Sequence, residues 1–79
     1  MNSIVFKIDG NVVDKDNFVT SYLGAKNKDV LNKAVNKIEA FRIEIDESGG
    51  AVEINLVGEE LIYNWKGIPE GLKNRMESE

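Results

Sequence analysis

The feature that most constrains this sequence is a change of hydrophobic period near residue 41. Apolar residues alternate strictly with charged residues over residues 41–46, and a similar alternation returns over residues 51–57, after two consecutive glycines. An alternation of period two places apolar side chains on one face of a β-strand and polar side chains on the other. The pattern therefore predicts a β-hairpin over residues 41–57 with one buried face and one solvated face.

Two further strands are predicted on either side of this hairpin. In residues 4–8, Ile4, Phe6 and Ile8 alternate with Val5 and Lys7, which gives a strand with one strongly apolar face, and the following residues Asp9-Gly10-Asn11 favour a turn. Residues 61–65 form the last strand, after a second tight turn. The sequence thus supplies enough strands for one small sheet.

Helices are predicted before the hairpin and at the end of the chain. The first ends before Gly24 and is capped by Asp14 or Asp16. The second covers residues 29–40, where apolar residues recur at helical spacing. Pro69 suits the first position of a terminal helix.

These elements define an α+β fold in the order β–α–α–β–β–β–α. We expect one four-stranded, mostly antiparallel sheet with the helices packed on one face, because two layers bury one face of a sheet. The sequence has no internal repeat or linker, so we expect residues 1–79 to form a single domain. The expected core consists of the inward-facing apolar residues Ile4, Phe6, Ile8, Phe18, Tyr22, Leu31, Val35, Ile38, Phe41, Ile43, Ile45, Val52, Ile54 and Leu56.

The sequence lacks the residue types on which most catalytic and metal sites depend. None of the 79 residues is cysteine or histidine. Thiolate nucleophiles, zinc–thiolate sites and histidine bases are therefore excluded. No glycine-rich phosphate-binding motif occurs, and the acidic segment over residues 9–16 departs from the spacing of a calcium-binding loop. We expect no enzymatic activity, no cofactor and no metal.

The net charge of −4 conceals an uneven distribution. Residues 1–38 carry six lysines and four aspartates, whereas residues 39–79 carry ten acidic and four basic residues. Glu44 and Asp46 are two apart in a predicted strand, so their side chains share a face, and Glu53 and Asn55 belong to the returning strand. We predict that this acidic sheet face binds a protein. The alternative is a solvated face with no partner.

The last predicted strand has two possible registers. Tyr63 and Trp65 lie on one of its faces and Ile62 lies on the other. If Ile62 faces the core, the two aromatic rings are exposed and are candidate anchors for the same partner. In the other register, which the pattern favours, both rings face inward, and the terminal helix covers them through Leu72 and Met76.

Two other functions are compatible with the sequence. Four lysines lie on or before the second predicted helix and are interleaved with asparagines. They are Lys26, Lys28, Lys33 and Lys37. Lysine can bind phosphates, and asparagine can bind adenine edges. A nucleic-acid-binding accessory protein is the first alternative, although an acidic chain is not typical of that class. A homo-oligomeric structural or assembly subunit is the second.

The opening of the chain resembles short phage and prophage proteins of AT-rich bacteria. The resemblance rests on the first strand, on the segment IDGNVV at residues 8–13 and on a short helix containing Phe18, and it covers about the first 23 residues. Small acidic phage proteins of this type are often non-enzymatic, and some inhibit a host or defence protein by occupying its surface, so the resemblance implies a role of that kind. No apolar run is long enough to span a bilayer and no signal-peptide pattern is present, so we expect no membrane partner and a cytoplasmic location.

Overall fold

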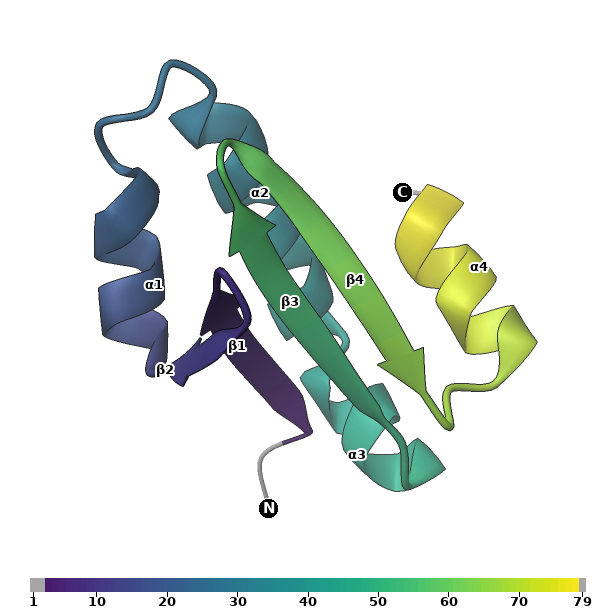
Figure 1. Ribbon diagram of the computed structural model, residues 1–79. Helices are drawn as coiled ribbons and strands as arrows, with labels where there is room; N and C mark the ends of the chain where they lie inside the picture. The colour runs from purple at the N-terminus through teal and green to yellow at the C-terminus, as the bar shows by residue number, and fades with distance from the viewer. Residues whose placement is uncertain (1–2, 79) are drawn as a thin grey trace.

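A computed structural model describes residues 3–78 (Figure 1). The elements follow in the order β1 (Ile4–Ile8), β2 (Asn11–Val13), α1 (Lys15–Tyr22), α2 (Lys28–Ala40), α3 (Arg42–Ser48), β3 (Ala51–Val57), β4 (Glu60–Lys66) and α4 (Glu70–Ser78). The strands form one mixed sheet in the order β2-β1-β3-β4. The predicted α+β class and the four-stranded sheet are confirmed.

The two central strands are parallel, and the outer pairings are antiparallel. Ile4 of β1 pairs with Val52 of β3, and Phe6 pairs with Ile54. Between these two strands the chain first forms the edge strand β2 and then leaves the sheet through three helices. A parallel pair needs such a long connection, because the chain must return to the same end of the sheet before the second strand begins.

The prediction of a strand over residues 41–46 is wrong, because these residues lie in helix α3 or directly before it. Ile38, Phe41 and Ile45 are spaced at i, i+3 and i+7, which also places them on one side of a helix. Ile45 is fully buried and Phe41 packs against the core, whereas Ile43 is 68% exposed. The alternating pattern therefore contained a helical stripe that continues from α2.

The fourth strand comes instead from β2, which follows the predicted turn directly. Asp9 and Gly10, at φ 50° and 85°, connect β1 to β2. Two successive residues in the left-handed region are typical of a type I′ turn, and Asp-Gly is a preferred sequence for it. The predicted turn is thus confirmed, and it brings Val13 opposite Phe6.

The core lies between the sheet and all four helices. It consists of Ile4, Phe6, Phe18, Tyr22, Leu31, Val35, Ile38, Ile45, Val52, Ile54, Leu56 and Met76. Ile8 and Phe41 of the predicted core are only partly buried. Ile43 was wrongly assigned to the core, because in a helix it points away from Ile45. Met76, which the prediction gave to helix packing and not to the core, is buried from α4.

Gly50 allows the start of β3 to approach the end of β4 closely. A Cβ atom built on Gly50 would lie 2.6 Å from the carbonyl oxygens of both Lys66 and Gly67. These are backbone atoms, so they cannot rotate away as a side chain would. A glycine is therefore required at this position by sterics.

We predict that Gly50→Ala destabilises the fold by about 1–3 kcal/mol, because the added methyl group must displace the β4 backbone. Gly71→Ala in α4 is the matched control, because a Cβ atom there meets no atom within 4 Å. Alanine is favoured over glycine in a helix, so the control is expected to raise stability by up to about 1 kcal/mol. Urea unfolding of both variants measures the difference. Equal stabilities would contradict the close approach.

Candidate functional site

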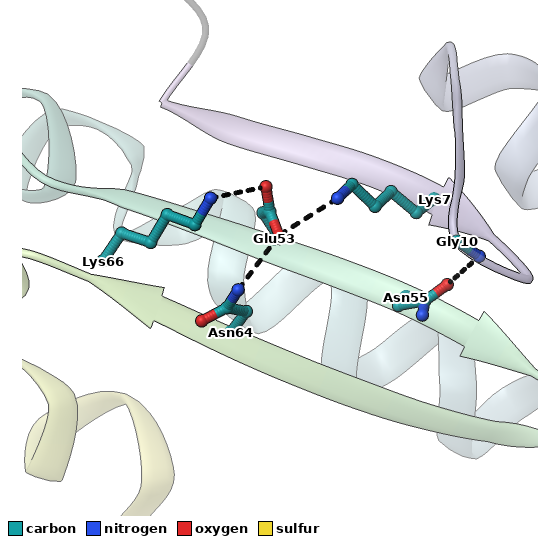
Figure 2. A network of polar contacts seen from close by, with 6 residues as sticks. All are labelled: Lys7, Gly10, Glu53, Asn55, Asn64 and Lys66. Carbon is teal, nitrogen blue, oxygen red and sulfur yellow. Dashed lines mark hydrogen bonds and ion pairs between the residues drawn. The ribbon is translucent and has the colours of Figure 1, made fainter.

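Within residues 3–78, one face of the sheet carries no helix. All four helices contribute to the core on the side of Ile4, Phe6 and Ile54, and Figure 1 shows α2 behind the strands. Figure 2 views the sheet from the same side as Figure 1, opposite to the helices, which lie behind the strands. We call this side the open sheet face. It carries the alternate residues Val5, Lys7, Val12, Ala51, Glu53, Asn55, Val57, Glu60, Ile62, Asn64 and Lys66.

Glu53 lies at the centre of the open sheet face and joins three strands (Figure 2). Its carboxylate lies 3.2 Å from the Lys7 ammonium of β1 and 3.0 Å from the Lys66 ammonium of β4. The Asn64 amide donates a third contact, with 3.1 Å between Nδ2 and Oε1. The Glu53 side chain is only 15% exposed. The strands are thus connected by side chains as well as by their backbones.

These contacts determine the protonation state of Glu53. Its pKa is lowered, first by the hydrogen bond from Lys66 and then by the hydrogen bond from Lys7. A carboxyl that serves as a general acid at neutral pH needs the opposite shift, which burial without a cation produces. Glu53 is therefore suited to hold the sheet together as a carboxylate and not to donate a proton.

Asn55 fixes the turn at the end of the same face. Its Oδ1 accepts a hydrogen bond from the Gly10 backbone N–H at 3.0 Å (Figure 2). The Asp9 N–H donates to the carbonyl of Leu56 at 3.0 Å. Both contacts connect β3 to the β1–β2 turn, and they hold Gly10 at the end of the open sheet face.

The predicted acidic sheet face does not form. Glu53 and Asn55 lie on the open sheet face, but Glu44 and Asp46 lie on helix α3, where residues two apart point in different directions. Asp46 accepts a hydrogen bond from the hydroxyl of Ser3. The centre of the face holds two lysines for one glutamate, and it is therefore not acidic.

Tyr63 and Trp65 face the helices, as the favoured register predicts. They pair with the buried residues Ile54 and Val52, and their rings stack with centroids 5.5 Å apart. The Lys73 ammonium of α4 lies 5.8 Å from the centroid of the Trp65 ring. Burial raises the pKa of the Tyr63 hydroxyl. The two rings therefore cannot serve as anchors on the open sheet face.

Three apolar residues take the exposed positions instead. Val12 is 69% exposed, Ile62 is 51% exposed and Val57 is 41% exposed. Ile62 pairs with Asn55, and Val12 pairs with Lys7, so they flank the polar centre. We did not identify these residues as site residues from the sequence. The signal was the alternation itself, since once Tyr63 and Trp65 face inward, Ile62 must face outward.

The lysines of α2 lie on the other side of the molecule. Lys33 and Lys37 border a hollow between α2, β4 and α4. Asn32, one of the asparagines between them, accepts a hydrogen bond from the buried Tyr22 hydroxyl at 2.9 Å. The Asn32 Oδ1 atom is therefore already hydrogen-bonded within the fold.

Comparisons with known proteins do not assign the chain to a family. No protein-family model, no curated protein and no solved structure matches it. Over residues 3–78, the acidic side chains form no group that could hold a metal ion. Across the same residues, no helix has the length and apolar content needed to cross a membrane.

We predict that Glu53→Gln makes the fold less sensitive to acid. The pKa of Glu53 is lowered in the folded state, so its contribution to stability is present above the unfolded pKa of about 4.3 and is lost as pH falls through the folded pKa. The variant lacks this titration. Its stability at neutral pH should be lower, and its decline between neutral pH and pH 3 should be shallower. Thermal unfolding across that range is the measurement.

The matched control is Glu47→Gln, which neutralises an exposed carboxylate on α3. We expect this variant to follow the acid profile of the wild type more closely than Glu53→Gln does. If both variants have the same profile, the contacts of Glu53 with Lys7 and Lys66 do not stabilise the sheet.

Proposed function

We propose that this chain is a non-enzymatic binding protein that docks a folded protein on its open sheet face. The observation that supports the proposal best is the exposure of Val12, Val57 and Ile62 around an ordered polar centre. A partner that covers large apolar side chains removes their surface from water, and this burial favours the complex. An open sheet of short strands also offers a flat surface, which suits a folded partner.

The polar centre supports the proposal through pre-organisation. Glu53 holds Lys7, Asn64 and Lys66 in fixed positions before any partner binds. Side chains that are already ordered lose little entropy on binding. The side chain of Lys66 is 56% exposed despite its ion pair. The partner surface that fits best is therefore apolar, with a carboxylate opposite Lys66.

The proposed effect on the partner is steric occlusion. Covering part of a protein surface blocks the contacts that this surface would otherwise make, and it needs no chemical step. A phage-encoded inhibitor of a host or defence protein would work in this way, and we propose that role as the specific form of the function. Nucleic-acid binding through α2 is the competing assignment.

We predict that Ile62→Asp weakens capture of the partner more than tenfold. A charge introduced into an apolar contact must be desolvated without a counter-ion, and single residues of an interface can contribute about 2 kcal/mol or more. The measurement is affinity capture from the source cells by wild-type and variant proteins, followed by titration of the captured protein.

Ile43→Asp is the matched control. Ile43 is also exposed but lies on α3, away from the open sheet face. Retained capture by this variant and loss of capture by Ile62→Asp would support the proposal. Equal capture by both variants would refute it. Binding to DNA or RNA that weakens steeply with salt would favour the competing assignment.

A further inference from the structure

The helical side of the molecule has a groove that the proposed function does not use. Two hollows of about 350 Å³ each lie between α2 and its neighbours. One reaches α4 and the other reaches the β3–β4 turn. Both are lined by Val30, Ala34 and Tyr63, so they form one continuous groove along α2. We call it the α2 groove.

The two ends of the α2 groove differ in charge. The end near α4 is lined by Lys33 and Lys37, with Glu77 as its one acidic residue. The end near the β3–β4 turn is lined by Glu59 and Glu60 and has no lysine. Asn27 lines this acidic end, and its side-chain amide donates to the Glu59 carbonyl at 2.9 Å. One end is thus basic and the other acidic.

The middle of the α2 groove is apolar and exposed. Val30 is 68% exposed although it lies next to the buried residue Leu31. Ala34, one helical turn further on, is half-buried. An exposed valine beside a hollow is able to enter a matching hollow on another molecule, as a knob enters a hole.

We propose that the α2 groove binds a second copy of this chain, related by a two-fold axis that crosses α2 between Val30 and Ala34. Such an axis makes the two α2 helices antiparallel and places residue 37 of one copy opposite residue 27 of the other. The basic end of each groove then faces the acidic end of its partner. The charge pattern is self-complementary under this symmetry, as an isologous interface requires.

The size of the molecule permits such a dimer. A standard interface buries about 800 Å² of each partner, which is about a sixth of the 4989 Å² surface of this chain. Lys37 and Asn27 are ten residues apart on or beside α2, so the charged ends are separated by about 15 Å along the helix. The open sheet faces stay on the outside of the dimer. The dimer can therefore fail while the proposed function holds, and the reverse.

The first test is sedimentation of the full chain from about 1 µM to about 1 mM, a range that covers moderate and weak association. We expect the average mass to rise from 8.8 kDa toward twice that value. Val30→Asp should weaken dimerisation more than tenfold. Ile43→Asp, which alters an equally exposed residue outside the groove, should leave the dimer intact. Circular dichroism checks that both variants are folded.

The second test is a charge exchange. Lys37→Glu and Glu59→Lys each place like charges at both contacts of their own homodimer, because the proposed axis sets residue 37 opposite residue 27, whose side chain is bonded to the Glu59 carbonyl. A mixture of the two proteins restores opposite charges at both contacts. We expect each protein alone to be monomeric at concentrations where the wild type is dimeric, and the mixture to form heterodimers.

Three results would overturn the proposal. The wild type could stay monomeric over the whole concentration range. It could form a dimer that Val30→Asp and the charge variants do not weaken, which would place the contact on another surface. The mixed charge variants could also fail to associate while the wild type dimerises.

Discussion

The structure depends on the parallel pairing of β1 with β3. Ile4 and Val52 are 48 residues apart in sequence and neighbours in the sheet. Because parallel strands cannot be joined by a tight turn, the intervening chain must cross from one end of the sheet to the other. It does so through three helices, whose apolar residues share one core with Ile4, Phe6, Val52 and Ile54. The helices therefore cover one face, and the other face stays open.

The open face needs its own source of order, since no layer packs on it. Glu53 provides it by binding Lys7 of β1 and Lys66 of β4, on either side of its own strand. Asn55 adds a contact with the β1–β2 turn. The same contacts that stabilise the sheet also fix the polar side chains that a partner would meet. Stability and proposed binding thus depend on the same few residues.

The sequence predicted much of the fold because most hydrophobic patterns have a single interpretation. The inward residues of β1 and β3 were assigned correctly, as were Leu31, Val35 and Ile38 of α2. Residues 41–46 were not, because Ile45 is compatible both with a period of two and with a helical stripe from Ile38. Only the tertiary context decides between them, since β1 occupies the edge of β3 that a hairpin would have needed.

The candidate site was predicted less well, for the same reason. Glu53 and Asn55 were placed on the correct face, because the alternation in β3 is unambiguous. Glu44 and Asp46 were placed on the sheet because residues 41–46 were predicted as a strand, whereas these residues lie in α3. The exposure of Ile62 followed from the inward register of Tyr63, but the prediction was based on the acidic residues and did not include Ile62. Predicting a strand where α3 forms therefore gave the open sheet face two carboxylates that it does not carry.

The central claim is that β1, and not residues 41–46, pairs with β3. Nuclear Overhauser effects measured on the isotope-labelled protein test it most directly. We expect backbone contacts between Phe6 and Ile54 in a parallel register, and helical contacts within residues 42–48. Antiparallel contacts between residues 41–46 and 51–57 would contradict it.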